Sequence, residues 1–335
     1  MSRKIAVLGA GSWGTALAVH LSGKNLPIYL WDHDLNHINM LKKDYENKKH
    51  LPKINFPKSL NIATDLKSAI IDADYFLIVV PSEACRVVLD SILTQTQSKP
   101  ISVIWAGKGF DNQTTGLISS VFSEKLPATS RFGIISGPSF AKEVAEGRPA
   151  AVTIASEDQK FASELAELFS TPYFRVYTSD DVPGIQLGGG IKNILAIAAG
   201  ISDGLGYGAN ARAALITRGL NEILQLGDKF GAKRETMFGL SGLGDLVLTC
   251  TDDQSRNRRL GLALATQKTL EEAKKDIQQV AEGAAAAQVV NDMGRKFGLD
   301  MPICSVVYKV LYEQMSPEQA VTELLEREQK PEASS

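Results

Sequence analysis

One rhythm in the sequence constrains the fold more than any other feature. Short runs rich in β-branched and aromatic residues alternate with helix-length segments, and the runs predicted as strands lie at 4–8, 27–31, 75–80, 101–105, 131–136, 151–156 and 173–177. This alternation is typical of βαβ units, which build a mainly parallel sheet with helices on both faces. The later segments are long and helical, at 186–201, 209–228, 255–266, 269–276, 281–297 and 304–313.

The change of rhythm predicts two domains, and a length of 335 residues suits two. The Pro183-Gly184 pair ends the last strand pattern. We therefore predict an α/β protein. Its N-terminal domain, 1–182, is a Rossmann-type, doubly wound, mainly parallel sheet, and its C-terminal domain, 183–335, is all helical.

Composition excludes several classes of protein. A formal net charge of -2 shows no basic excess for nucleic acid, and no uninterrupted apolar stretch is long enough for membrane insertion. Cys85, Cys250 and Cys304 are far apart, so we expect no disulfide framework, no metal site and a cytoplasmic location. All four histidines lie in the first fifty residues. Acid–base chemistry in the second domain would therefore need Lys, Asp, Glu or Tyr.

The segment VLGAGSWGTALAVHL places Gly9, Gly11 and Gly14 in G-x-G-x-x-G spacing between a predicted strand and a helix. Glycines permit the tight turn and let a pyrophosphate approach the backbone amides at the helix start. A turn that binds nothing would not need all three. Asp32 follows the second strand, where a Rossmann domain usually contacts the adenosine ribose, so this segment predicts a dinucleotide site.

Two further segments follow predicted strands, where open α/β sheets bind ligands. In WAGKGFD, Lys108 stands between two glycines, and it is either a ligand contact or a solvated loop lysine. In ISGPSFAKE, Gly137 and Ser139 precede a helix whose amides could meet an anion, although a proline and a serine at a helix start need no ligand.

The segment GLGDLVLTCTDDQSRNRRLG combines Asp245 with an arginine-rich helix start. Arginines at Arg256, Arg258 and Arg259 oppose the positive end of the helix dipole. A bound phosphate would remove that conflict, because arginine binds phosphate through two parallel hydrogen bonds. The alternative is a surface ion-pair cluster with the neighbouring aspartates.

In QLGGGIKNILAIAAG, Lys192 lies within a helix that is apolar nearly all round. It either extends its ammonium to water along an apolar surface or is held inside for chemistry. Since the predicted second domain has no histidine, lysine is its natural acid–base candidate.

AGSWGTALA, GKGF, SGPSFAKE, QLGGGIKNILAIAAG, GANARAALITRG and GLGDLVLTCTDDQSRNRR together resemble the bacterial NAD(P)-dependent glycerol-3-phosphate dehydrogenases, over about residues 4 to 325. The resemblance implies that Lys192 is the proton donor and acceptor. It implies substrate contacts from Lys108, Gly137, Ser139, Asp245, Ser255, Arg256 and Asn257. It implies cofactor contacts from Ser12, Trp13, His33, Lys108, Ala141, Arg256, Val280 and Glu282, beside Gly9, Gly11, Gly14 and Asp32.

The implied reaction interconverts dihydroxyacetone phosphate and sn-glycerol 3-phosphate, a phospholipid precursor, with NAD(P)H and no metal. Asp32 argues for NAD, but His33 follows it, the family often accepts NADPH, and water screens the repulsion from an exposed carboxylate, so we expect both dinucleotides to work. A homodimer is one option that the sequence leaves open. Two other classes remain: another Rossmann dehydrogenase with a helical second domain, and a non-catalytic nucleotide sensor, which would have no use for Lys192 and Asp245 together.

Overall fold

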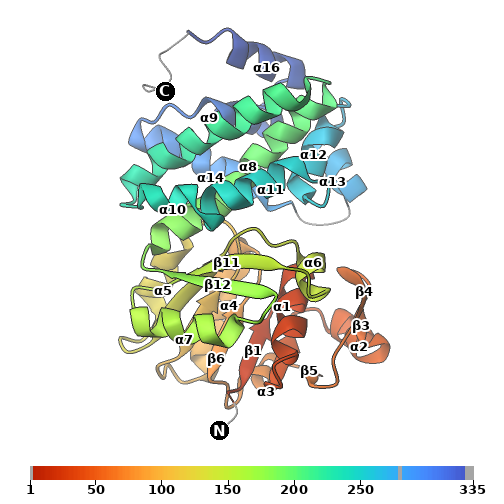
Figure 1. The fold of residues 1–335 in the computed structure, drawn as a ribbon, viewed down its shortest axis with the longest axis vertical. Helices are drawn as coiled ribbons and strands as arrows, with labels where there is room; N and C mark the ends of the chain where they lie inside the picture. The colour runs from red at the N-terminus through yellow and green to blue at the C-terminus, as the bar shows by residue number, and fades with distance from the viewer. Residues whose placement is uncertain (1–2, 278–280, 329–335) are drawn as a thin grey trace. The chain divides into compact units, whose positions relative to one another are not determined.

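The computed structural model describes residues 3–277 and 281–328. The chain forms two compact units (Figure 1). The first contains Met1–Gly107 and Ile118–Val182, and the second contains Lys108–Leu117 and Pro183–Ser335. Each unit has its own hydrophobic core.

The first unit is built on an eight-stranded sheet. In spatial order its strands are β12 (Phe174–Ser179), β11 (Ala150–Ala155), β10 (Arg131–Ser136), β7 (Ser102–Trp105), β6 (Tyr75–Ile78), β1 (Ile5–Leu8), β2 (Ile28–Trp31) and β5 (Leu60–Ile62). Only the β10–β11 pair is antiparallel. From β5 to β10 the order is that of the Rossmann fold, which confirms the predicted fold class.

Every residue of β1, β6 and β7 is buried, because helices cover both faces of this sheet. These helices are α1 (Ser12–Ser22), α2 (Leu35–Asp44), α3 (Leu66–Ile70), α4 (Cys85–Gln95), α5 (Ile118–Lys125), α6 (Ala141–Ala145) and α7 (Gln159–Phe169). Each predicted strand forms, with ends that differ by at most two residues. The short β5 and the hairpin of β3 (Glu46–Asn47) and β4 (Leu51–Asn55) were not predicted, since such short segments show no clear periodicity.

The second unit is helical apart from a small hairpin of β8 (Phe110–Asp111) and β9 (Gly116–Leu117). Its helices are α8 (Val182–Gly204), α9 (Gly208–Lys229), α10 (Arg234–Phe238), the π-helical turn η2 (Leu240–Gly244), α11 (Asp245–Thr251), α12 (Arg256–Leu264), α13 (Leu270–Ile277), α14 (Glu282–Phe297), α15 (Pro302–Tyr312) and α16 (Pro317–Leu325). All six predicted helices form. The predictions omitted α10, α11 and α16, which are short.

Helix α8 is the core helix of the second unit. It is long and apolar enough to cross a membrane, but the whole of its most apolar stretch is buried inside the protein. Its glycines permit close helix contact: a Cβ on Gly200 would lie 2.1 Å from the Arg258 carbonyl oxygen of α12. On the facing helix, a Cβ on Gly261 would lie 2.1 Å from the Ile197 carbonyl oxygen. Backbone therefore packs directly on backbone where α8 meets α12.

The segment Lys108–Leu117 belongs to the second unit, although the predicted boundary placed it in the first domain. Phe110 and Leu117 are buried in the helical core, and the Phe110 ring packs against Gly190 of α8. The sequence pattern reflects only that this segment follows a strand. As a result, Lys108 lies in the same unit as Lys192.

Candidate active site

The glycine loop joins β1 to α1. Gly9 has φ +115°, and a Cβ on Gly14 would lie 1.9 Å from the Gly9 carbonyl oxygen, so both positions require glycine. A Cβ on Gly11 would meet nothing within 4 Å. Gly11 is also the N-cap of α1 and supplies no side-chain cap to the helix amides. An open backbone with free helix amides fits the pyrophosphate of a dinucleotide.

Two residues at the start of α1 border this loop. The Ser12 hydroxyl donates to the His50 carbonyl oxygen at 2.6 Å, so it is already engaged. The Trp13 indole N–H is buried and finds no acceptor in the part of the chain that the structure describes. Because a buried donor without an acceptor is costly, Trp13 fits a role in holding a ligand.

Asp32 follows β2 as predicted, but its carboxylate faces inward. The Ala10 and Asp34 amides both donate to it at 3.0 Å. His33 Nδ1 lies 3.2 Å from Asp32 Oδ1, and the His33 side chain is 90% exposed. The exposed imidazole is thus the more accessible of these two groups, while Asp32 supports the glycine loop.

Gly137, Ser139 and Ala141 follow β10, at the same carboxyl edge of the sheet as the glycine loop. Gly137 has φ +147°, and the Ser139 hydroxyl donates back to its carbonyl oxygen at 3.0 Å. Helix α6 begins at Ala141 with Phe140 as N-cap, and no side chain caps it. Open α/β sheets bind ligands at this edge, outside the carboxyl ends of the strands.

In the second unit, Lys192, Lys108 and Asp245 form one buried cluster. Asp245 is 1% exposed and Lys192 is 4% exposed. Lys192 Nζ donates to Asp245 Oδ1, and Lys108 Nζ donates to Asp245 Oδ2 at 2.9 Å. The Lys192 ammonium therefore faces a carboxylate and not water, which excludes the solvent-reaching alternative.

Two lysines share one carboxylate, so the cluster is positive by one charge when all three groups are ionised. Burial lowers the pKa of Lys192 to about 7, with repulsion from Lys108 adding to the effect and Asp245 opposing it. Burial alone would also lower the pKa of Lys108, but Asp245 holds it above its usual range. Lys192 is therefore the member that can release and regain a proton near neutral pH.

Thr249 is the residue of this cluster that the sequence analysis missed. Its hydroxyl accepts from Lys192 Nζ at 2.9 Å and donates to the Asp245 carbonyl oxygen at 2.6 Å. Thr249 stands four residues after Asp245 on α11, so both lie on one helix face. That spacing is the only sequence signal that could have found it.

The arginine-rich start of α12 divides into two roles. Arg258 is buried, and its guanidinium pairs with Asp203 at 2.6 Å and with Asp253 at 2.5 Å. Arg256 is half-buried and forms no ion pair within residues 3–277 and 281–328. The ion-pair alternative thus describes Arg258, whereas the Arg256 guanidinium has no ion-pair partner in those ranges.

The other α12 residues are structural as well as available. Ser255 is the N-cap of α12, and its hydroxyl accepts from the Arg258 amide at 3.2 Å. Asn257 accepts from the Gly283 amide at 3.0 Å, which ties α12 to the start of α14. Glu282, the first residue of α14, helps to raise the pKa of Lys108. Val280 lies outside the described residues.

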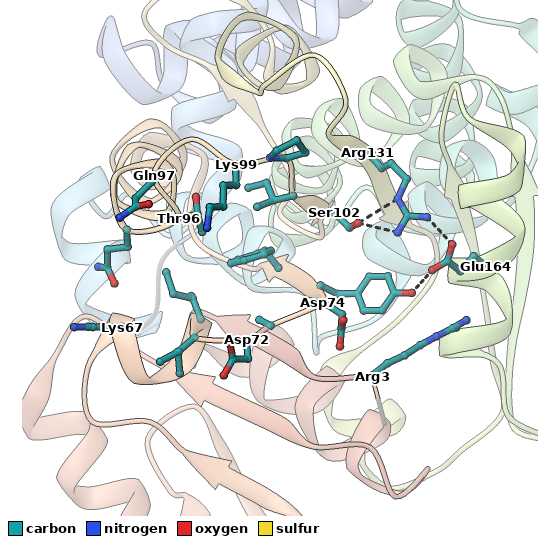
Figure 2. Close-up of a pocket in the computed structure, with 18 residues that line it drawn as sticks. Arg3, Lys67, Asp72, Asp74, Thr96, Gln97, Lys99, Ser102, Arg131 and Glu164 are labelled. Carbon is teal, nitrogen blue, oxygen red and sulfur yellow. Dashed lines mark hydrogen bonds and ion pairs between the residues drawn. The ribbon is translucent and has the colours of Figure 1, made fainter. Parts of the chain in front are cut away.

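Two hollows lie away from the lysine cluster and the glycine loop. One, of about 790 Å³, lies at the amino-terminal ends of β6, β7 and β10, opposite the glycine loop (Figure 2). There Arg131 binds Glu164 and Ser102, and Tyr75 donates to Glu164, so this polar group is self-satisfied. The other, of about 1000 Å³, is bordered by α8, α9, α15 and α16. Neither is lined by the lysine cluster or by the glycine loop.

A Rossmann unit with an open glycine loop, together with a buried proton-exchanging lysine, defines a dinucleotide-dependent oxidoreductase. Among the residues in the described ranges, no group of three or more His, Cys, Asp or Glu side chains could hold a metal ion.

Comparison with known proteins identifies the family. Residues 4–162 match the N-terminal model of the NAD-dependent glycerol-3-phosphate dehydrogenases, and residues 181–322 match the C-terminal model. The chain belongs to this family.

Individual relatives agree with the family models. A glycerol-3-phosphate dehydrogenase (NAD(P)+) of Thioalkalivibrio sulfidiphilus is 50% identical over 328 residues, covering 98% of both chains. The namesake from Nitrosococcus oceani is 50% identical over 326 residues, covering 97% of this chain and 94% of the relative. A crystal structure of glycerol-3-phosphate dehydrogenase from Coxiella burnetii superposes with a TM-score of 0.94 at 44% identity, covering 97% of this chain and 99% of that one.

Proposed function

We propose that the protein catalyses the interconversion of dihydroxyacetone phosphate and sn-glycerol 3-phosphate with NAD(P)H, and so supplies glycerol 3-phosphate for phospholipid synthesis. The observation that carries this proposal is the buried cluster of Lys192, Asp245 and Lys108, in which one lysine titrates at about pH 7. The family and its NAD(P)+-dependent relatives supply the substrate class.

The domain division proposed here is a dinucleotide-binding domain, 1–182, and a substrate-binding and catalytic domain, 183–335. The proposed cofactor residues are Gly9, Gly11, Ser12, Trp13, Gly14, Asp32, His33, Lys108, Ala141, Arg256, Val280 and Glu282. The open Gly11 backbone and the unpaired Trp13 indole support this assignment.

The proposed substrate residues are Lys108, Gly137, Ser139, Lys192, Asp245, Ser255, Arg256 and Asn257. Arg256 holds the phosphate, because its planar guanidinium forms paired hydrogen bonds and the start of α12 adds the positive end of a helix dipole.

Lys192 is the proposed proton donor for ketone reduction. The bound reduced nicotinamide supplies the hydride for carbon 2 of the substrate. Lys192 gives a proton to the carbonyl oxygen, which would otherwise gather negative charge, and takes it back in the reverse direction. Lys108 donates to the other oxygen of Asp245, and Asp245 with Thr249 holds the Lys192 amine in place.

We further propose a cytoplasmic location and a homodimer. Cys85, Cys250 and Cys304 are buried and form no disulfide with one another, which suits a reducing compartment. Exposed apolar side chains on the second unit, Tyr207, Phe238 and Leu325, offer surface for a second copy. Light scattering of the purified protein measures the assembly directly.

The function is tested by mixing the protein with dihydroxyacetone phosphate and each reduced nicotinamide and following the loss of nicotinamide absorbance. We expect turnover with the phosphorylated ketone and little with unphosphorylated dihydroxyacetone. A folded Lys192→Met variant should lose about two to four decades of kcat. Turnover on the unphosphorylated ketone alone, or no turnover with either dinucleotide, would overturn the proposal.

A further inference from the structure

Asp32 and His37 form a buried pair beneath the glycine loop. His37 is 2% exposed, and its Nδ1 lies 3.4 Å from Asp32 Oδ2. The same Asp32 oxygen accepts from the Ala10 amide of the loop at 3.0 Å. One carboxylate thus connects the end of β2, the glycine loop and the first turn of α2.

The orientation of the Asn47 amide follows from its partners. Its Nδ2 donates to the Ala10 carbonyl oxygen and to Thr15 Oγ1, each at 2.8 Å. Its Oδ1 accepts from the His50 amide at 3.1 Å. Turning the amide over would set its oxygen against the Ala10 carbonyl and its nitrogen against the His50 N–H. Asn47 Oδ1 must therefore be the atom that faces His37.

Both ring nitrogens of His37 consequently face acceptors. Nδ1 faces the Asp32 carboxylate, and Nε2 lies 3.1 Å from Asn47 Oδ1. A neutral imidazole has one donor and one acceptor nitrogen, and only the imidazolium donates from both. This arrangement favours the imidazolium form of His37.

The titration directions agree with this geometry. The hydrogen bond to Asp32 raises the pKa of His37, against an opposing effect of burial. Burial would raise the pKa of Asp32, but hydrogen bonds from His37 and from the Asp34 and Ala10 amides hold it well below its usual range. Both shifts favour the ionised pair, in which the two charges cancel.

We propose that His37 determines the tolerance for both nicotinamide dinucleotides, by cancelling the charge of Asp32 and holding its carboxylate on the glycine loop. An acidic residue at the end of the second strand normally repels the 2′-phosphate of NADP. Here that charge is balanced and turned toward Ala10. His37 acts through Asp32, so it is a positioning residue. The proposal rests on the dinucleotide site of the proposed function.

Few other charged groups face this pair. The His33 imidazole lies on the exposed side of Asp32, and the His50 ring stands edge-on to His37 with centroids 5.1 Å apart. Lys49 opposes the protonation of His37 but does not reverse it. These three side chains are basic, whereas Asp34 is a second acid beside the pair, and its carboxylate accepts from the Asn36 amide at 2.9 Å as the N-cap of α2.

The test measures binding of NAD+ and NADP+ to the protein without substrate, by intrinsic fluorescence or calorimetry. His37→Asn keeps a donor toward Asp32 but removes the positive charge. We expect this variant to weaken NADP+ binding relative to NAD+ by about tenfold, as one partly screened like-charge contact would. The double variant Asp32→Asn/His37→Asn, which removes both charges, should restore the wild-type ratio within about twofold.

His20→Asn is the matched control, because it also removes a partly buried histidine from the first unit, at the other end of α1. Its NADP+ to NAD+ ratio should not change. An unchanged ratio in His37→Asn, or an equal loss for both dinucleotides, would overturn the specificity role. Failure of the wild type to bind either dinucleotide would instead overturn the proposed function.

A second readout needs no variant. Nitrogen NMR of the unliganded protein at neutral pH should show both His37 ring nitrogens protonated. A single protonated nitrogen would contradict the imidazolium on which the proposal depends, even if every His37 variant failed to fold.

Discussion

Replacement of Lys192 by methionine should stabilise the protein while removing its catalysis. In the fold, burial lowers the pKa of Lys192 to about 7, against the ordinary value of 10.5. That difference of 3.5, at about 1.4 kcal/mol for each pH unit, disfavours folding by about 5 kcal/mol at neutral pH. Methionine is unbranched and apolar, so it can occupy the buried space without this cost.

Part of the gain is offset by lost hydrogen bonds. The variant loses the hydrogen bonds that Lys192 donates to Asp245 and Thr249. Hydrogen bonds from a charged donor contribute about 1.5–3 kcal/mol. Asp245 is not left unpaired, since Lys108 still donates to it at 2.9 Å. A net gain of about 2–3.5 kcal/mol in the free energy of unfolding is therefore expected at pH 7.

The assay is urea denaturation of the unliganded protein at several pH values. Because the folded pKa is depressed, the folded state binds fewer protons than the unfolded chain between about pH 7 and pH 10.5. Wild-type stability therefore rises with pH in this window, and the advantage of Lys192→Met should shrink. The control Lys296→Met, at an exposed position of α14, should change stability by less than about 0.5 kcal/mol. If Lys192→Met were less stable than wild type at pH 7, or kept its turnover, the argument would fail.

Three further predictions concern other parts of the site and core. Arg256→Lys keeps the charge but loses the paired hydrogen bonds, so kcat/KM for the phosphorylated ketone should fall about tenfold or more. Activity on dihydroxyacetone should change little, and equal losses on both substrates would refute a phosphate role. Gly14→Ala places a Cβ 1.9 Å from the Gly9 carbonyl oxygen, so the Kd for NAD+ measured by fluorescence should rise at least about tenfold, and an unchanged Kd would contradict the loop assignment. Burial raises the pKa of Glu222 to about 7 from 4.5, so wild-type stability should fall by about 3 kcal/mol between about pH 4.5 and pH 7. Urea titrations of Glu222→Gln should lack this fall in stability, and a pH profile like that of the wild type would contradict the prediction.

Local patterns were sufficient to predict the longer elements and the fold class. A strand buried on both faces needs a run such as the IAVL of β1, and a βαβ unit needs such runs at helix-length intervals. The glycine loop was equally predictable, because the backbone conformation at Gly9 and the close contacts at Gly14 allow only glycine. The candidate residues of the loop could therefore be named from spacing alone.

The protonation of buried side chains and the partners that they meet could not be predicted from local patterns. Lys108 and Asp245 are separated by 137 residues and Lys192 and Asp245 by 53, yet they meet in one buried cluster. The pKa of Lys192 depends on this meeting, since burial and a second ammonium act only over short distances. The resemblance to a family could name these residues and the role of Lys192, but only the folded structure supplies the burial and the second ammonium that lower its pKa.

Asp32 illustrates the same division. The sequence by itself determined its place at the end of the second strand, because that position follows from strand length and the spacing to the glycine loop. Only the tertiary structure decided that the carboxylate turns toward the Ala10 amide and the His37 ring. The direction of a side chain is set by the donors that surround it after folding, and those donors come from segments whose contact no local pattern records.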